Sequence, residues 1–361
     1  MTETIEIPLG SQHIALLEPM HLTFSCENET VRSVKSDMGY VHRGVEYACQ
    51  NRFDFKVVPT VVGRICGLCA ITHSTAACLA IEKSMGIVVS DRAKWLRILA
   101  LELDRVHSHL LCLAHTAESA GYEALFMKTM MRREAVMDAI EALTGNRVQF
   151  DYAAIGGVNK DLTPETARTI REKLAEIRSA VDEISDRFAN NAVLRLRFVS
   201  HGTLSAERVR ALGAVGLLAR SAGVKTDVRI ETDDLPYAAL GFEPIMEQDG
   251  DIHARNTARL KEVLQSCDLI DRVIDSLPEG EIKVKVRGRP SQEAVARVEA
   301  PRGELFYLIK GSGTSILDRL RIRTPTYANL GVFLEIFVGE EYANVPPILA
   351  SLDPCMSCTA R

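Results

Sequence analysis

The sequence predicts a mainly α-helical protein of the α+β class, in which a central bundle of long helices is joined by β-rich segments near both ends. Apolar residues recur at three- and four-residue steps over long stretches of 92–275, which is typical of helices with one buried face. Stretches near both ends show strand-like patterns. We therefore expect one domain with a β-rich part over 1–60, a helical body over 61–280 and a C-terminal part over 281–361.

The first expected elements are two strands. His21–Cys26 and Thr30–Lys35 flank a turn that contains Asn28, which predicts a β-hairpin. A long helix is expected over 92–119, with Ser90 or Asp91 as its N-cap, because leucine and valine side chains recur there at helical spacing.

Four more helices complete the expected bundle. The Thr163-Pro164 pair is typical of a helix start, since threonine caps the first turn and proline fits the first helical position. Gly145 is a typical C-terminal residue for the helix before it. The expected ranges are 125–143, 164–188, 205–222 and 253–275.

The C-terminal part changes character. Glu281–Arg287 alternates polar and apolar residues with period two, and Glu304–Ile309 is a second expected strand. The stretch Phe333–Val338 fits either a short helix or a strand.

Composition excludes several classes of protein. Lys and Arg number 43 and Asp and Glu 48, a formal charge of −5, which argues against a nucleic-acid-binding protein. The longest uncharged stretch, Ile65–Ile81, includes His73 and is too polar and too short for a membrane span. The N-terminus lacks a secretory signal pattern, so we expect a cytoplasmic location.

Two pairs of cysteines carry the strongest functional signal. The first lies in Arg64-Ile-Cys66-Gly-Leu-Cys69-Ala-Ile-Thr-His73, and the second in Asp353-Pro-Cys355-Met-Ser-Cys358-Thr-Ala-Arg361. An odd total of nine cysteines argues against a disulfide framework. Four thiolates suit zinc, an iron–sulfur cluster, or a nickel or iron thiolate site.

A structural zinc site fits this pattern poorly. Such sites usually join cysteine pairs a dozen or two residues apart, whereas most of the chain separates these two pairs. Zinc also gives no reason for the flanking Arg64, His73 and Asp353. A thioredoxin-like redox pair is disfavoured because neither motif follows a βαβ pattern.

The two motifs together resemble the large subunit of nickel–iron hydrogenases. Further segments resemble that family along the whole chain, namely His42-Arg43-Gly44-Val45-Glu46, Glu299-Ala-Pro-Arg302-Gly and Arg323-Thr-Pro325-Thr326. The resemblance implies the hydrogenase large-subunit fold.

Other segments point to one subgroup. The ending C-x-x-Arg, Arg105-Val-His-Ser-His109 and Ile155-Gly-Gly-Val158 resemble the energy-converting, membrane-bound hydrogenases, especially the CO-induced and Ech-type enzymes. The same segments resemble the homologous quinone-site subunit of respiratory complex I, which lacks the four thiolates.

The resemblance implies a nickel–iron centre whose iron carries CO and cyanide. All four thiolates would bind nickel, with Cys66 and Cys355 terminal and Cys69 and Cys358 bridging to iron. His73 would donate a hydrogen bond to a bridging sulfur. Pro325 and Thr326 would line the iron ligands.

Three further residues belong to the implied site. Arg302 would lie over the open metal position, where a guanidinium acts by its charge or by positioning rather than as a base. Asp353 belongs to the cofactor-binding set. Glu18, in Leu17-Glu18-Pro19, would relay protons to and from Cys355.

Glu46 is where the chain departs from the uptake enzymes. In those enzymes the matching carboxylate and a C-terminal histidine help to bind a further metal ion. Here Arg361 replaces the histidine, and a guanidinium is not a metal ligand, which argues against Mg or Fe at Glu46. We expect a Glu46–Arg361 ion pair instead.

The implied function is the interconversion of H₂ with protons and electrons by heterolytic cleavage, within an ion-pumping membrane complex and in a subgroup associated with CO oxidation. No further C-x-x-C set is present to hold iron–sulfur clusters in this chain. The implied partners are an iron–sulfur small subunit, integral membrane subunits, a ferredoxin-like donor acting through other subunits, and maturation proteins. The chain would then lie peripherally on the cytoplasmic side of the inner membrane. The alternative is a complex I-like quinone-site or coupling subunit with a structural thiolate metal site.

Overall fold

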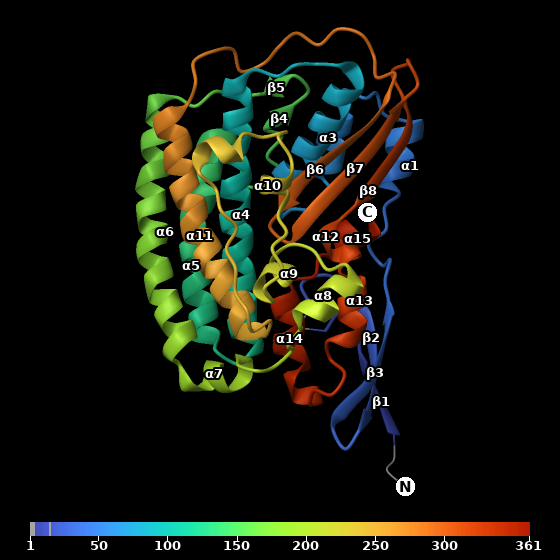
Figure 1. Cartoon of the computed structure of the whole chain (residues 1–361), viewed down its shortest axis with the longest axis vertical. Helices are drawn as coiled ribbons and strands as arrows, with labels where there is room; N and C mark the ends of the chain where they lie inside the picture. Colours follow the sequence, from blue (N-terminus) through green and yellow to red (C-terminus); the bar gives the residue numbers. More distant parts are fainter. Residues whose placement is uncertain (1–3, 14–15) are drawn as a thin grey trace.

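Four long helices lie side by side and form one half of the molecule (Figure 1). They are α4 (Asp91–Ser119), α5 (Glu123–Thr144), α6 (Pro164–Asn190) and α11 (Ile252–Ser276). The expected caps are present: the hydroxyl of Ser90 accepts from Ala93 N at 3.2 Å, and that of Thr163 accepts from Thr166 N at 3.1 Å. The long helices predicted from apolar periodicity are therefore confirmed, and they lie to one side of the molecule rather than at its centre.

A three-stranded antiparallel sheet lies beside the bundle. Its strands are β6 (Glu293–Ala300), β7 (Gly303–Gly311) and β8 (Leu317–Arg323), in that order. Helix α3 (Ala70–Met85) packs between this sheet and α4 and is buried on nearly all sides. That position explains why 65–81 carries no charge, because a helix without a solvent face has no place for one.

A second antiparallel sheet projects from one end of the molecule (Figure 1). It consists of β1 (Thr4–Leu9), β2 (His21–Glu27) and β3 (Thr30–Asp37), so the predicted hairpin is confirmed. The C-terminal part packs on it: Val31 N donates to Glu340 O at 2.9 Å, and Phe24 makes an edge contact with Phe337. The two ends of the chain are thus joined in space.

Two expectations need correction. The single helix expected over 205–222 is two, α8 (Ala206–Leu212) and α9 (Leu217–Ser221), because Gly213 and Gly216 between them adopt left-handed backbone angles. The stretch 281–287 is extended but forms only one bridge, from Lys283 to Gly157. That bridge extends a hairpin of β4 (Ala153–Ala154) and β5 (Gly157–Val158).

The undecided stretch 333–338 begins as a helix. Its first residues belong to α13 (Leu330–Glu335), and a turn follows. The remaining short helices are α1 (Val45–Asn51), α2 (Val58–Gly63), α7 (Ala192–Phe198), α10 (Val228–Glu231), α12 (Pro325–Ala328), α14 (Val345–Leu352) and α15 (Met356–Ala360), with 3₁₀ turns at Tyr237–Leu240 and Tyr342–Asn344.

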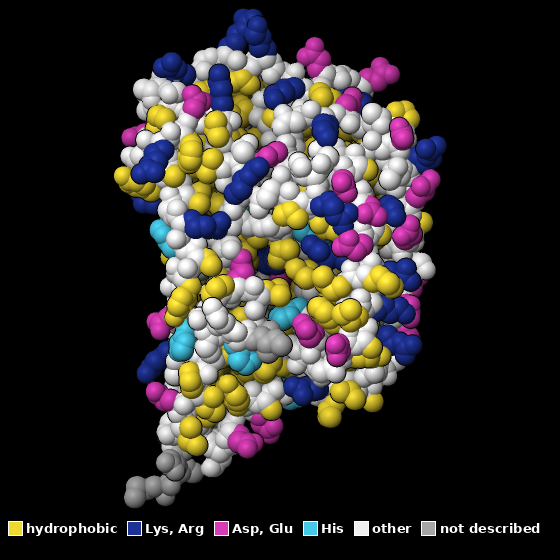
Figure 2. Space-filling view, turned by 180° about the vertical axis from the view of Figure 1, so that it is seen from behind, with side chains coloured by type: hydrophobic (Ala, Val, Ile, Leu, Met, Phe, Trp, Pro, Cys, Tyr) yellow, Lys and Arg dark blue, Asp and Glu magenta, His cyan; other side chains and the backbone are white. Residues whose placement is uncertain are grey.

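The computed structural model describes residues 4–13 and 16–361. One continuous set of buried apolar side chains runs through the helices and both larger sheets. Within the described residues, no helix is long and apolar enough to cross a membrane. Figure 2 shows acidic and basic side chains interspersed over one face, as a small net charge predicts. The division of the chain at residues 60 and 280 stays a prediction.

Candidate metal centre

The two cysteine motifs occupy two similar turns, each just before a helix. Cys69 is the N-cap of α3, and Cys355 is the N-cap of α15. Within each turn the first sulfur accepts a backbone N–H: Leu68 N lies 3.3 Å from Cys66 Sγ, and Cys358 N lies 3.4 Å from Cys355 Sγ. These N–H groups stabilise negative charge on sulfur, as a metal-binding thiolate requires.

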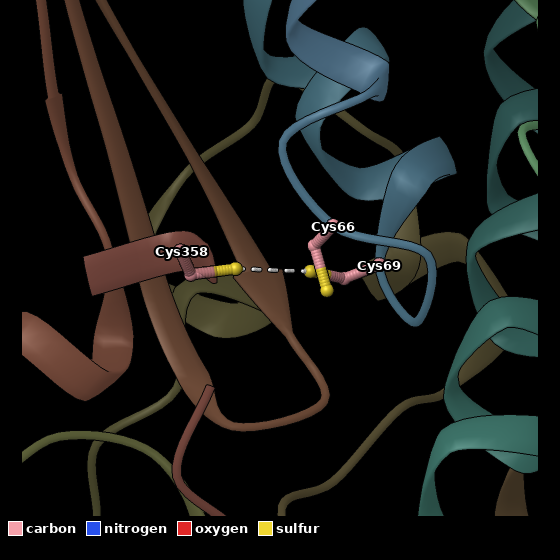
Figure 3. A group of neighbouring side chains, drawn as sticks. All are labelled: Cys66, Cys69 and Cys358. Carbon is pink, nitrogen blue, oxygen red and sulfur yellow. Dashed lines mark hydrogen bonds between the residues drawn. The ribbon is translucent and has the colours of Figure 1, made fainter. Parts of the chain in front are cut away.

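The turns face one another, so that the four sulfur atoms form one buried group. Cys66 Sγ lies 3.4 Å from Cys355 Sγ, and Cys69 Sγ lies 3.6 Å from Cys358 Sγ. The sulfurs of Cys66, Cys69 and Cys358 all lie within 4.8 Å of one another, and Figure 3 shows them pointing toward a common point. None of the four is in a disulfide, and each is at least 96% buried.

This donor set fits the implied nickel–iron group. Four free, buried thiols offer the soft ligands that nickel and iron accept, and they lie near enough to be shared between two metals. Hydrogen bonds, first from Cys355 and then from Cys358 and Cys69, hold the pKa of Cys66 well below its usual value. The hydrogen bond to Cys355 raises the pKa of Cys358. Among the four sulfurs, the surroundings therefore favour the thiolate form most at Cys66.

Arg43 ties the two turns together. Its guanidinium donates to the carbonyls of Arg64 at 2.8 Å and Ile65 at 2.7 Å, next to the first motif. It also donates to the carbonyl of Ser357, inside the second motif, at 3.3 Å. The planar fork of an arginine suits such multiple contacts.

His73 lies one helical turn after Cys69, where its ring reaches the second motif. Its Nε2 is 3.4 Å from Cys358 Sγ, and its Nδ1 is 2.7 Å from the hydroxyl of Tyr307. Burial lowers the pKa of His73 to about 4, so the ring is neutral. If Tyr307 donates to Nδ1, the ring proton is on Nε2 and points at the sulfur.

Arg302 lies in the tight turn between β6 and β7, and it is 92% buried rather than a surface side chain. Its Nε donates to Asp353 O at 2.8 Å, its Nη2 to Asp353 Oδ1 at 2.7 Å, and its Nη1 to Ser108 Oγ at 3.1 Å. Burial would lower its pKa, but the charges of Asp353, Cys355 and Cys66 outweigh burial and hold the pKa well above the usual value. Arg302 is therefore a fixed positive charge.

Asp353 and α12 complete the wall around the second motif. Asp353 ends α14 in a left-handed conformation, and its Oδ2 is buried without a hydrogen-bond partner among the described residues. Thr326 accepts a hydrogen bond from Cys355 N at 3.2 Å, which leaves its own O–H free to donate. Thr324 donates to Cys358 O at 3.2 Å. Pro325 is buried between these two threonines.

Glu18 reaches the second motif from the segment before β2. Its Oε2 accepts from Ser357 N at 2.9 Å, one residue before Cys358. The side chain is half-buried, and it makes no direct hydrogen bond to a cysteine among residues 4–13 and 16–361. The structure thus brings Glu18 to the motif, on its outer side.

Glu46 and Arg361 form the expected ion pair, with Arg361 Nε 2.9 Å from Glu46 Oε1. Arg321 holds the other oxygen at 2.7 Å, and Ile322 N donates to Oε1 at 2.9 Å. Burial alone would raise the pKa of Glu46, but the hydrogen bonds from Arg361 and Arg321 outweigh it and lower the pKa. Two guanidinium groups already satisfy this carboxylate.

Sequence reasoning missed Tyr307, Ser108 and the role of Arg43 as a clamp. The alternating pattern of its strand indicates only that Tyr307 is buried, and Ser108 lies inside an apolar helical pattern. Arg43 and Ser108 each lie in a segment that the family resemblance had marked, His42–Glu46 and Arg105–His109, whereas Tyr307 lies in none.

Comparisons with known proteins cover the whole chain. Residues 120–289 and 285–361 match the family described as respiratory-chain NADH dehydrogenase, 49 Kd subunit. Residues 43–117, which include the first cysteine motif, match the family described as nickel-dependent hydrogenase.

The similar proteins include both hydrogenases and subunits of NADH-quinone oxidoreductases. The carbon monoxide-induced hydrogenase of Rhodospirillum rubrum is 37% identical over 99% of both chains. The membrane-bound hydrogenase subunit alpha of Pyrococcus furiosus is 33% identical over 99% of this chain and 87% of that one. A subunit of the NADH-quinone oxidoreductase of Carboxydothermus hydrogenoformans is 32% identical over 98% of this chain and 97% of that one.

One solved structure extends the range of reactions. A chain of the membrane-bound sulfane sulfur reductase, an archaeal respiratory membrane complex, superposes with a TM-score of 0.93 at 27% identity over 99% of both chains. The same fold therefore occurs in membrane complexes with different substrates, and the side chains of the site must decide between them.

Proposed function

Because this chain belongs to the family that unites the 49 Kd subunit of respiratory-chain NADH dehydrogenase with subunits of membrane-bound hydrogenases, we propose that it is the catalytic subunit of a nickel–iron hydrogenase. One observation carries the proposal: two thiol pairs from opposite ends of the chain meet in a buried group, beside a neutral histidine and a fixed arginine. Its relatives are subunits of energy-converting membrane complexes.

The chain's residues divide the work of such a site. A nickel–iron pair, with CO and cyanide on iron, supplies the heterolytic splitting of H₂ when it is bound. Cys66, Cys69, Cys355 and Cys358 would hold it. His73, oriented by Tyr307, donates a hydrogen bond to the sulfur of Cys358 and lowers its charge density.

Arg302 and Glu18 handle charge and protons. Arg302 keeps a positive charge next to the thiolates, which stabilises negative charge that develops there. Glu18 Oε2 is held by Ser357 N, and its carboxyl group would exchange protons with solvent and, from its place beside the second motif, with the Cys355 thiol. With the metal group bound, Thr326 would offer its O–H, and Pro325 an apolar surface, to the ligands on iron.

The rest of the assembly follows from what this chain would need. Electrons would leave through an iron–sulfur small subunit and come from a ferredoxin-like donor by way of other subunits. Ion pumping would belong to integral membrane subunits, with this chain peripheral on the cytoplasmic side. Maturation proteins would insert the metals. A link to CO oxidation rests on the similarity to the enzyme of Rhodospirillum rubrum.

An infrared spectrum of the complex purified from its native host tests the proposal directly. Bands of metal-bound CO and cyanide are expected, because no protein group absorbs in that region. Their absence from an intact complex that contains nickel would overturn the hydrogenase assignment.

A complex I-like coupling subunit is the second candidate, favoured by the extent of the 49 Kd family match. Cys69→Ser separates the two. Under the first function it abolishes H₂ turnover, and under the second it only lowers stability or assembly. Cys78→Ser is the matched control, since Cys78 is an equally buried thiol on α3 outside the sulfur group. It should retain turnover.

A further inference from the structure

A second group of ionisable side chains is buried between α4, α9, α10, α11 and β6, and we call it the acid–arginine cluster. Its members are Glu102, Arg105, His109, Arg220, Asp227, Arg229, Glu262 and Glu299. All are at least 96% buried. The function proposed above uses none of them.

The cluster has one carboxyl group too many. It holds four carboxyl groups but three guanidinium groups, and an uncompensated buried charge is costly. His109, whose Nε2 lies 2.9 Å from Glu262 Oε2, does not supply the missing charge, because burial lowers its pKa to about 4. One carboxyl group is therefore expected to be neutral and to hold a proton.

Hydrogen bonding identifies which carboxyl that is. Glu262 accepts from Arg220 and His109, Asp227 accepts three times from Arg229, and Glu102 accepts from Arg105, Ser266 and Tyr237. Glu299 has only one guanidinium contact, from Arg220 Nη1 to Oε1 at 2.7 Å, and one N–H, from Val228 to Oε2 at 3.1 Å. Of the four carboxyl groups, Glu299 therefore accepts the fewest hydrogen bonds that would stabilise a negative charge.

The electrostatics agree with that choice. Burial, and then the charge of Asp227, raise the pKa of Glu299 to about 7. The pKa values of Glu102, Asp227 and Glu262 are lowered instead, because their arginine contacts outweigh burial. Beyond the cluster, Arg297 on β6 pairs with Glu231 on α10 and with Glu304 on β7, which lies opposite Glu299 in the sheet. The charge of the buried Arg259 on α11 acts on His109, while its guanidinium donates to Ser351 O.

Glu299 lies beside a small pocket at the surface. A surface pocket of about 10 Å³, the space for one water molecule, is lined by Glu299 together with Arg229 and Tyr237 on its inner side. Its outer side is formed by Thr232, Asp234 and Arg297. A water molecule there would lie next to Glu299.

The cluster is also joined mechanically to the turn that carries Arg302. Arg105 donates to the carbonyls of Glu299 at 2.8 Å and Ala300 at 3.3 Å, just before that turn. Arg220, which holds the Glu299 carboxyl, lies on α9, whose N-cap is Gly216. Gly216 and Gly303 meet back to back, and a Cβ on Gly216 would collide with Gly303 Cα and the Arg302 carbonyl. A shift of α9 therefore moves the turn.

We propose that Glu299 is a proton-binding positioning residue: its carboxyl group takes a proton from solvent through the small pocket and thereby sets the position of the Arg302 turn. The step moves one proton from a hydronium ion to the carboxylate, leaving a water molecule, and moves no electron. The consequence for H₂ chemistry rests on the function proposed above, whereas proton binding by Glu299 does not.

An infrared pH titration of the assembled complex, from about pH 5 to about pH 9, tests proton binding. The wild type should show the C=O band of a protonated carboxylic acid that shifts in D₂O and disappears near neutral pH. Glu299→Gln, which mimics the neutral acid in size and hydrogen bonding, should lack that band. Glu304→Gln should keep it, since Glu304 lies opposite Glu299 in the sheet but is partly exposed and paired with Arg297 and Arg323. Absence of such a band from the wild type refutes the proposal, whether or not the variants fold.

Hydrogen–deuterium exchange of the peptide spanning 300–303 tests the link to the turn. At low pH the wild type and Glu299→Gln should exchange equally, and above neutral pH the wild type should exchange several-fold faster. An unchanged ratio at every pH would refute the coupling. If the wild type shows no H₂/D⁺ exchange, the proposed function fails, yet the infrared and exchange measurements still decide the role of Glu299.

Discussion

Replacing Glu18 by glutamine isolates proton transfer from every other property of the site. The amide oxygen of glutamine can still accept from Ser357 N, which the Glu18 carboxylate does at 2.9 Å. Only the ionisable group is lost. We expect Glu18→Gln to bind its metals as the wild type does and to lose nearly all H₂/D⁺ exchange.

The two effects differ enough in size to be separated. Exchanging a charged acceptor for a neutral one at a single hydrogen bond lowers stability by about 1 kcal/mol. Losing a general acid–base group lowers a rate by about 10²- to 10⁴-fold, which corresponds to about 3–5 kcal/mol in the barrier. A stability loss of about 1 kcal/mol leaves a protein of ordinary stability almost fully folded, so unfolding does not account for the loss of exchange.

The assay is H₂/D⁺ exchange per nickel atom, because this reaction needs proton movement but no electron partner. Glu27→Gln is the matched control, since Glu27 lies at the far end of β2, the strand that follows Glu18, and its side-chain partners among the described residues are the surface groups of Arg32 and Thr4. It should exchange at the wild-type rate. Exchange at the wild-type rate in nickel-loaded Glu18→Gln would remove Glu18 from the proton path.

Three further outcomes follow from the geometry. Tyr307→Phe leaves His73 Nδ1 buried without its partner, so it should keep nickel but shift the infrared bands of the metal ligands; unshifted bands would show that the tyrosine does not orient the ring. Arg302→Ala leaves the Asp353 carboxylate buried and unpaired, so we expect the free energy of unfolding to fall by about 3–5 kcal/mol. Arg302→Lys should lie between the wild type and Arg302→Ala. A decrease below about 1 kcal/mol for Arg302→Ala would contradict the buried pair. The pKa of Glu299 is about 7 in the folded state against the usual 4.5, so between these pH values the folded state holds a proton that the unfolded state releases. The free energy of unfolding should therefore fall by up to about 3 kcal/mol as pH rises through that window. Denaturation measured at several pH values should show no such loss for Glu299→Gln.

The residues of the site were more predictable than their partners. Spacing and chemistry marked the four cysteines, because a metal ligand must be one of a few residue types, and the resemblance to hydrogenases marked His73. Tyr307 and Ser108 carry no such mark, since a hydroxyl in an apolar pattern is typical of any core. Their roles arise only where β7 passes His73 and where α4 passes the Arg302 turn.

The same limit explains the errors in the fold. Long helices were found because a repeating apolar pattern survives local exceptions, as in α4 and α11. The break between α8 and α9 was missed because it depends on a close contact between Gly216 and Gly303, residues that are distant in sequence. The acid–arginine cluster was missed for a related reason: most of its charges lie on α4, α9, α10 and α11, and they are buried where these helices and β6 pack together.

The two cysteine motifs lie far apart in the chain, so contacts other than the thiols must bring them together. Closing a loop of 289 residues costs about 5 kcal/mol of chain entropy, so something other than the thiols must hold the turns together. Arg43 bonds to both turns, Glu18 and Thr326 bond to the second, and the continuous apolar core packs around them. These contacts do not involve the sulfur atoms as ligands. A serine in place of one cysteine should therefore remove a metal ligand while the fold survives, in contrast to a zinc finger, where metal binding supplies the folding energy. That is the physical reason why Cys69→Ser can separate a catalytic thiolate group from a structural one.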